Sequence, residues 1–174
     1  MITQKFLTKN KYSRVGKPLN KLLGVVIHYV GVNHQIPEQT VAYFESLKYG
    51  KNQIYASAHY VIGTDGNGIQ CIPDTEVAYH CGAKLYKPGI VEKLSQYPNY
   101  TTIGIELCHT PNGFTEETLE TASNLVAQIL LENDLLINDV YRHYDITGKI
   151  CPKFFVDSES DWKKFKERVM SKCQ

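Results

Sequence analysis

Several features of exported, membrane-bound or nucleic-acid-binding proteins are missing from this sequence. Its 174 residues contain no apolar run long enough to cross a bilayer, and the first six residues lack the apolar centre of a signal peptide. The net charge is only +1, so we expect no nucleic-acid partner and no binding to an anionic membrane. The chain is therefore expected to be made in a cytoplasm and not exported by the general secretory route.

The five cysteines also lack the arrangement of a disulfide framework. An odd number leaves one thiol over, and no two of them form a C-x-x-C pair. In a reducing compartment most of them are expected to be buried thiols that pack as small hydrophobic groups. Cys81 is ambiguous because it follows His80, and Cys151 is an exception because of the residues around it.

The order of apolar and turn-forming segments predicts a single α/β domain over residues 1–174. Hydrophobic residues make up 43% of the chain and charged residues 21%, which is typical of a globular domain with its own core. Strands are expected at 24–30, 57–62, 69–72, 101–108 and 139–142, and helices at about 37–49, 89–95, 115–133 and 161–170. The turn at 64–68 requires an antiparallel pair, so we expect a central mixed β-sheet flanked by helices.

The segment 142–152 is the most informative part of the sequence. It holds His143 and Cys151, eight residues apart, in a stretch too long for one helical face and too irregular for a strand. A short loop around an ion would bring both side chains together, and imidazole and thiolate are ligands that suit zinc. His28, at the end of the apolar run 24–27, is the best third ligand, with a hydrogen-bonded core histidine as an equal alternative. Three protein ligands leave one tetrahedral position for water, as in catalytic zinc sites.

Glu106 lies inside an apolar strand whose residues alternate between two faces. Ile103 and Ile105 share the core face, whereas Glu106 shares the other face with Gly104. One interpretation is an exposed second face or a buried ion pair, and the other is a general base beside a metal. Partial burial would raise the Glu106 pKa and a zinc charge would lower it, which suits a group that must accept a proton and return it.

Other polar side chains offer further candidates. His80, in the loop-like stretch 78–83, is either a ligand or substrate contact or a structural residue. His59 is expected to pack within its strand, and His109 is expected to be exposed at a turn. Lys149 is either a solvated surface group or, because it lies two residues before the cysteine of the predicted metal loop, a cation that stabilises a developing oxyanion.

Five short motifs occur in a recognisable order along the chain. They are Val26–Tyr29, Ser57–Ile62, Ala78–Ala83, Ile103–Leu107 and Arg142–Pro152. This order resembles the zinc-dependent N-acetylmuramoyl-L-alanine amidases of the type 2 amidase family, which shares its fold with peptidoglycan recognition proteins. The resemblance implies a mixed sheet like that of the recognition proteins, with helices on its faces and zinc in a surface groove.

The resemblance also implies roles for individual residues in the reaction. It implies one Zn²⁺ per chain, with His28, His143 and Cys151 as its ligands. Glu106 would be the acid/base residue, and Lys149 would assist at the oxyanion.

For the substrate groove, the resemblance points to Tyr79 and His80. They occupy the positions at which members of the family often have a tryptophan–histidine pair lining the groove, so we expect both to bind substrate. Some phage members place a catalytic tyrosine just before the histidine of the second strand. This chain has Ala58 there, which shifts the acid/base role to Glu106.

The implied activity is hydrolysis of the amide bond between N-acetylmuramic acid and L-alanine in bacterial peptidoglycan, causing lysis of the cell wall. One alternative is a non-catalytic peptidoglycan receptor of the same fold. Another is a thiol hydrolase that uses Cys151 with His143 and Glu106. The missing export signal favours the catalytic domain of a phage endolysin, held in the host cytoplasm until its release to the wall. A C-terminal cell-wall-binding module in a longer parent protein would fit this hypothesis.

Overall fold

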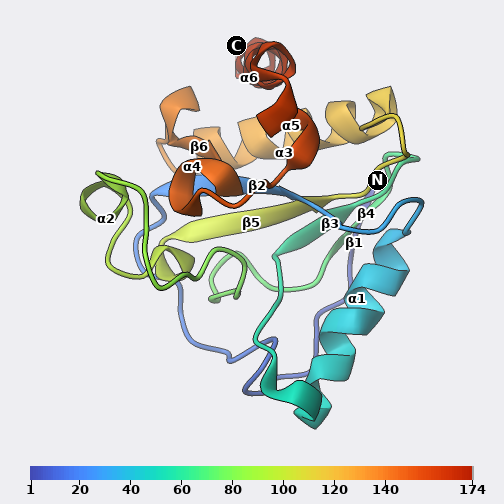
Figure 1. The fold of residues 1–174 in the computed structure, drawn as a ribbon, viewed down its shortest axis with the longest axis vertical. Helices are drawn as coiled ribbons and strands as arrows, with labels where there is room; N and C mark the ends of the chain where they lie inside the picture. The colour runs from blue at the N-terminus through green and yellow to red at the C-terminus, as the bar shows by residue number, and fades with distance from the viewer. Residues whose placement is uncertain (174) are drawn as a thin grey trace.

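A six-stranded β-sheet forms the middle layer of the computed structural model, which describes residues 1–173 (Figure 1). Across the sheet the strands follow the order β1-β4-β3-β5-β2-β6. Their bounds are β1 Ile2–Gln4, β2 Gly24–Tyr29, β3 Tyr60–Ile62, β4 Gly68–Gln70, β5 Thr102–Leu107 and β6 Val140–Arg142. Neighbouring strands run parallel except β3 and β4, which form an antiparallel pair. The sheet is therefore mixed, which confirms the prediction from the turn at 64–68.

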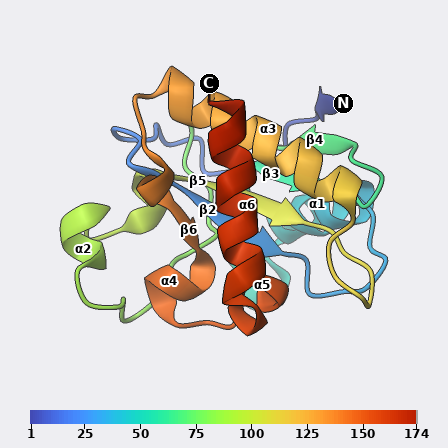
Figure 2. The same ribbon diagram turned by 90° about the horizontal axis from the view of Figure 1, so that it is seen from above.

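Helices cover the two faces of this sheet unequally. The longer helices are α1 Pro37–Ser46, α3 Glu116–Glu132 and α6 Glu159–Lys172, and the shorter ones are α2 Ile90–Lys93, α4 His143–Thr147 and α5 Lys153–Asp157. Short 3-10 turns lie at Leu47–Tyr49, Lys51–Gln53, Pro98–Tyr100 and Ile137–Asp139. Helices α3 and α6 cross one face, whereas α1 and long connecting segments lie on the other (Figures 1 and 2). Within residues 1–173, no helix has the length and apolar character needed to traverse a lipid bilayer.

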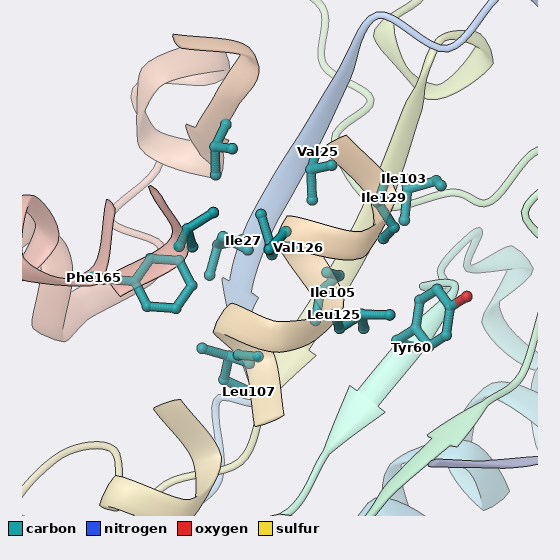
Figure 3. Packing of buried hydrophobic residues seen from close by; sticks show 14 of the residues in the cluster. Val25, Ile27, Tyr60, Ile103, Ile105, Leu107, Leu125, Val126, Ile129 and Phe165 are labelled. Atoms are coloured by element: carbon teal, nitrogen blue, oxygen red, sulfur yellow. The ribbon is translucent and has the colours of Figure 1, made fainter. Parts of the chain in front are cut away.

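The main hydrophobic core lies between the sheet and the layer of α3 and α6. Alternation along each strand sends every second side chain to this face. The cluster includes Val25 and Ile27 from β2, Ile103, Ile105 and Leu107 from β5, Leu125, Val126 and Ile129 from α3, and Phe165 from α6 (Figure 3). These side chains are buried and apolar, so this face of the sheet stabilises the fold. The other face carries two smaller apolar clusters, one that includes Val41, Val61 and Ile69 and one that includes Val26 and Ile146, as well as polar residues.

Helix α3 begins at the residue that the sequence predicts. The Thr115 hydroxyl oxygen accepts a hydrogen bond from the Thr118 N–H at 3.2 Å and so caps the first turn. Glu116 and Glu117 follow in that turn, where their charges complement the positive end of the helix dipole. The cap explains why the helix starts at this point, and burial of its apolar face explains why it lies on the sheet.

The observed strands are shorter than the predicted ones. The Ser57 N–H donates to the carbonyl of Tyr79 and not to a neighbouring strand, and β3 begins at Tyr60 instead of residue 57. The sequence does not predict β1 or α5, since elements of three and five residues are too short to show a periodic pattern. These differences shift element ends and leave the predicted sheet intact.

Candidate metal centre

Three parallel strands, β2, β5 and β6, bring polar side chains to one region of the sheet. Strands β2 and β5 pair in a register that sets His28 beside Glu106, so both side chains project from the same face. Strand β6 lies on the other side of β2 and is followed at once by His143. The carboxyl ends of parallel strands are the usual place for ligands in open α/β sheets. The polar groups therefore gather on the face opposite the main core.

A tight turn after helix α4 returns the chain to the same place. Helix α4 stands where a loop was predicted. In its first turn an Asp145 carboxylate oxygen accepts a hydrogen bond from the N–H of the preceding Arg142 at 2.8 Å, which favours the helical turn. Gly148 ends the helix with a φ of +82°, which glycine adopts without strain. The Tyr144 N–H then donates to the Cys151 carbonyl at 2.8 Å, which holds the returning segment against the helix.

The side chains of His28, His143 and Cys151 form a group that can hold a metal ion. All three are buried, and one nitrogen or sulfur atom from each lies within 4.8 Å of the others. His28 Nδ1 is 3.7 Å from Cys151 Sγ, near the separation of roughly 3.5 Å expected for nitrogen and sulfur ligands of one tetrahedral ion. His143 Nδ1 is buried without a hydrogen-bond partner in residues 1–173. An isolated buried nitrogen is costly, so the donor set and this unpaired atom both fit a bound cation.

Burial sets the protonation state of these ligands. It lowers the pKa of His28 well below its usual range and the pKa of His143 to about 4, and the nearby charge of Lys149 acts in the same direction. Both rings are therefore neutral at pH 7 and keep a lone pair for coordination. Burial raises the pKa of the Cys151 thiol to about 12. A bound divalent cation would counter that effect, because it stabilises the thiolate.

Glu106 has neither of the ordinary surroundings of a carboxylate in a strand. Gly104 in β5 and Cys108 just after it share the face of Glu106 and are buried, and Glu106 is half-buried at the groove, so this face is not an open solvent-exposed surface. Its Oε2 atom is buried and has no hydrogen-bond partner in the described residues. Burial raises the pKa of Glu106 to about 8, and the charge of Lys149 partly opposes this shift. A carboxyl group with a pKa in this range can both accept and donate a proton near neutral pH.

The metal-binding group and Glu106 open into a groove of about 820 Å³, a size typical of ligand-binding clefts. The other predicted site residues also line it, namely Tyr79, His80 and Lys149. Lys149 and Ile150 are exposed, so the groove meets solvent on their side. A second hollow of about 420 Å³ shares Glu106 and Lys149 with the groove. The structure thus brings every predicted site residue to one place.

Two further histidines lie outside the metal-binding group. His59 is fully buried, as predicted, and its Nδ1 accepts a hydrogen bond from the Gly104 N–H at 3.0 Å. The prediction that His109 is exposed is wrong, because only 4% of it is accessible. Its two ring nitrogens each lie 2.8 Å from a carbonyl oxygen, those of Val30 and Thr110. The ring therefore bridges the segments that follow β2 and β5, a contact between distant segments that no local pattern reveals.

His80 contacts the metal-binding group as well as the groove. Its Nδ1 lies 3.0 Å from His28 Nε2, and its Nε2 lies 3.2 Å from the Thr102 hydroxyl. Gly104 makes room for the ring, because a Cβ at that position would lie 2.5 Å from His80 Cγ. Sequence reasoning did not single out Thr102 as a site residue. A glycine inside a buried strand is the available signal, since it often marks a close approach.

The chain is thus a mixed-sheet α/β domain with a groove that contains a buried His–His–Cys group able to hold a metal ion. Comparison with known families then identifies one family that the chain matches. Residues 18–154 match the model of the family described as N-acetylmuramoyl-L-alanine amidase, and the chain belongs to this family. The resemblance inferred from the five sequence motifs is thereby confirmed.

Two relatives have similar sequences over almost the whole chain. The N-acetylmuramoyl-L-alanine amidase CwlL of Bacillus licheniformis is 31% identical over 171 residues, which cover 98% of this chain and 47% of CwlL. The amidase BlyA of Bacillus subtilis strain 168 is 31% identical over 180 residues, which cover 99% of this chain and 47% of BlyA. The chain thus spans about half the length of these curated relatives.

Solved structures share the fold. The catalytic domain of XlyA matches with a TM-score of 0.75 at 20% identity, and the match covers 97% of this chain and 99% of that domain. PlyL matches with a TM-score of 0.75 at 23% identity, over 97% of this chain and 96% of that structure. These matches confirm the predicted fold class, a central mixed sheet flanked by helices.

Proposed function

We propose that this chain is a zinc-dependent hydrolase that cleaves the amide bond between N-acetylmuramic acid and L-alanine in bacterial peptidoglycan. One observation carries the proposal, namely the buried His28–His143–Cys151 group with ligand atoms within 4.8 Å of one another. Two imidazoles and one thiolate suit zinc, and three protein ligands leave a coordination position for water or substrate. Membership of the amidase family supports the reaction.

In this proposal His28, His143 and Cys151 hold one Zn²⁺. Bound zinc would lower the pKa of a water ligand from about 16 toward about 7 and would polarise the scissile carbonyl. The charge of the ion would also lower the Glu106 pKa from its raised value, which favours the ionised form needed for a base.

Glu106 is the acid/base residue of the proposed reaction. Its carboxylate accepts the proton of the attacking water, while the water oxygen forms a bond to the carbonyl carbon. The same carboxyl group then donates that proton to the departing amine of L-alanine as the C–N bond breaks. Glu106 is half-buried, and its Oε2 atom has no hydrogen-bond partner in the described residues, which leaves this group free to carry the proton in both directions.

Lys149 and Tyr79 act on the substrate in this proposal. The Lys149 side chain lines the groove together with Glu106, and its ammonium group can neutralise negative charge that develops on the carbonyl oxygen. Tyr79 lines the same groove and offers an aromatic surface to the wall fragment. His80, which lines it too, is the remaining candidate for substrate contact.

We further propose that the chain acts as the catalytic domain of a phage endolysin. This role would place the chain in the host cytoplasm until its release to the cell wall. Relatives about twice as long as this chain are compatible with an additional cell-wall-binding module in a longer parent protein.

The two alternative functions are less well supported. A thiol hydrolase needs a thiolate nucleophile, whereas burial raises the pKa of Cys151 to about 12. A non-catalytic peptidoglycan receptor has no need for a buried carboxyl group with a pKa of about 8 beside a metal-binding group.

The proposal is tested by metal analysis of the purified protein together with mass spectrometry of digested wall fragments. We expect about one zinc per chain and fragments that end in free lactyl carboxylate and free L-alanine amine. A chelator should abolish cleavage, and added zinc should restore it. Cleavage that survives complete metal removal would support the thiol hydrolase, and zinc binding without cleavage would support the receptor.

A further inference from the structure

The hydrogen-bond chain behind His28 suggests a role for His80 that extends the proposed zinc function, on which this inference rests. This series of hydrogen bonds runs from His28 through His80 and Thr102 to the backbone carbonyl of Pro98. The first two links join side chains from different segments, and the third ends at a backbone carbonyl. His28 and Thr102 are buried. The direction in which the protons point along this chain follows from the partners at its far end.

The far end of the chain determines which nitrogen of His80 carries a proton. The Thr102 hydroxyl donates its only proton to the Pro98 carbonyl at 2.7 Å, so its oxygen acts as an acceptor toward the ring. The Thr102 carbonyl, which can only accept, lies 3.4 Å from the same His80 Nε2. Both partners therefore require the proton on Nε2, and in the neutral ring this leaves a lone pair on Nδ1.

The near end of the chain then determines the tautomer of His28. With a lone pair on Nδ1, His80 accepts a hydrogen bond at 3.0 Å from the N–H at His28 Nε2. The other nitrogen of His28, Nδ1, consequently keeps its lone pair, and this is the atom that faces Cys151 Sγ at 3.7 Å. A histidine ligand must present an unprotonated nitrogen to a metal, and His28 does so on the correct side.

The surroundings of His80 hold its ring in this position. Gly104 lies directly beneath the ring, where an added Cβ would come within 2.5–2.8 Å of three ring atoms. The Asn99 side-chain oxygen accepts hydrogen bonds from the backbone N–H groups of His80 and Cys81, at 3.2 and 2.8 Å. The His80 ring is thus held by close packing against Gly104, by the hydrogen bond from its backbone to Asn99 and by the contact of Nε2 with Thr102.

We propose that His80 is a positioning residue that fixes the tautomer and orientation of His28 as a metal ligand. Partners of this kind behind a ligating histidine raise its basicity, and their loss typically lowers metal affinity 10- to 100-fold. This role differs from the substrate contact that the sequence suggests for His80, because it acts on the ion in the absence of any wall fragment.

The test measures zinc affinity by competition with a chromophoric chelator, and the electronic spectrum of the Co²⁺-substituted protein, both without substrate. His80→Leu should weaken zinc binding about 10- to 100-fold and change the Co²⁺ ligand-field bands. His80→Asn should restore most of the affinity, because its side-chain oxygen can accept from His28 Nε2 in place of Nδ1. Circular dichroism of each metal-free variant shows whether it is folded.

A matched pair of hydroxyl deletions provides a second measurement that survives if His80→Leu fails to fold. Thr102→Val removes the hydroxyl acceptor of His80 Nε2 but keeps the more distant backbone carbonyl, so it should weaken zinc binding by less than His80→Leu. Thr101→Val removes a neighbouring buried hydroxyl, which donates to the Leu94 carbonyl at 2.7 Å and does not contact His80. This control should leave zinc affinity unchanged.

Unchanged zinc affinity and an unchanged Co²⁺ spectrum in folded His80→Leu would overturn the positioning role. If the same variant then showed a raised KM for wall fragments, His80 would be a substrate contact instead. Because zinc affinity is measured without substrate, it decides this inference independently of amide cleavage. Failure of the wild-type protein to cleave the wall would refute only the proposed reaction.

Discussion

The two faces of the central sheet differ in what their side chains can do, although both are built from the same strands. On the side of α3 and α6, β2 and β5 present Val25, Ile27 and Ile105 to an apolar core. On the other side the same strands present His28 and Glu106, which lie next to each other in the parallel register. The alternation of side chains along β2 and β5 thus separates the main core from the polar groups of the groove.

Buried polar atoms without a hydrogen-bond partner distinguish the groove side of the sheet. Within residues 1–173 two buried side-chain atoms lack a hydrogen-bond partner, Glu106 Oε2 and His143 Nδ1, and both lie on the groove side. Folding alone would disfavour such atoms, because each costs on the order of 1–3 kcal/mol. Their presence at the groove indicates that this part of the face is arranged for an ion and a reaction, although apolar clusters pack elsewhere on the same face.

The largest expected effect is the loss of wall cleavage in Glu106→Gln, which changes a residue on the groove side. The variant keeps the shape of the side chain but cannot accept a proton, so wall cleavage should fall by about 10²- to 10⁴-fold while zinc content stays near one per chain. A turbidity assay and metal analysis measure the two quantities. Glu92→Gln, at an exposed position, is the control and should retain full activity. Undiminished cleavage by Glu106→Gln would exclude the acid/base role.

Cys151→Ser should weaken zinc binding by more than the 10- to 100-fold typical of a residue behind the ligands, because it replaces a thiolate that binds the ion directly. Chelator competition measures this loss. Cys173→Ser is the matched control, since the Cys173 thiol donates to the Val169 carbonyl far from the groove and should leave affinity unchanged. Equal zinc affinity in the two variants would remove Cys151 from the ligand set.

Ile105→Ala should have the opposite result, because it should lower the stability of the fold and leave zinc affinity nearly unchanged. Ile105 is fully buried in the main core, so removal of its side chain should lower the free energy of unfolding by about 2–5 kcal/mol. Zinc affinity measured on the folded fraction should change little, because the neighbouring Glu106 and the metal-binding group lie on the other face. Denaturant unfolding checks the first quantity and chelator competition the second. Loss of affinity larger than that of His80→Leu would contradict the separation of the two faces.

The pH dependence of the metal-free protein should show the smallest of these effects. The folded-state pKa of Glu106, about 8, lies above the unfolded value of 4.5. The protonated group therefore favours the folded state fully below about pH 4.5, and this contribution is lost as pH rises toward 8. Between pH 6 and pH 8 the wild type should lose roughly 2 kcal/mol relative to Glu106→Gln. Parallel stability curves for the two proteins would show that burial does not raise this pKa.

Much of the fold was predictable from local patterns. The alternation of residues 103–107 placed Ile105 and Glu106 on opposite faces, and the Thr115 cap predicted the start of α3. Each of these two signals is contained within a few consecutive residues. Strand ends were less predictable, because the hydrogen bond from Ser57 N–H to the Tyr79 carbonyl, which draws the chain out of the sheet, joins residues far apart in sequence.

The candidate site was predictable to the extent that its residue types restrict the chemistry. His143 and Cys151 lie close together in the sequence, and their side chains suit zinc, so two ligands could be nominated from spacing. His109 could not be assigned, because its burial depends on carbonyl groups of two different segments. The partnership of His80 with His28 was likewise hidden, since 52 residues separate them.

The sequence by itself determined which chemistry is available, because the ligating and proton-carrying side chains and the alternation of each strand are written in short stretches of the chain. Only the tertiary structure decided how these groups act together. The register of β2 against β5 set His28 beside Glu106, and the hydrogen bonds that His80 makes with His28 and Thr102 oriented the ring of His28. The physical reason is that hydrogen bonding and burial depend on neighbours in space, which packing of the whole sheet selects.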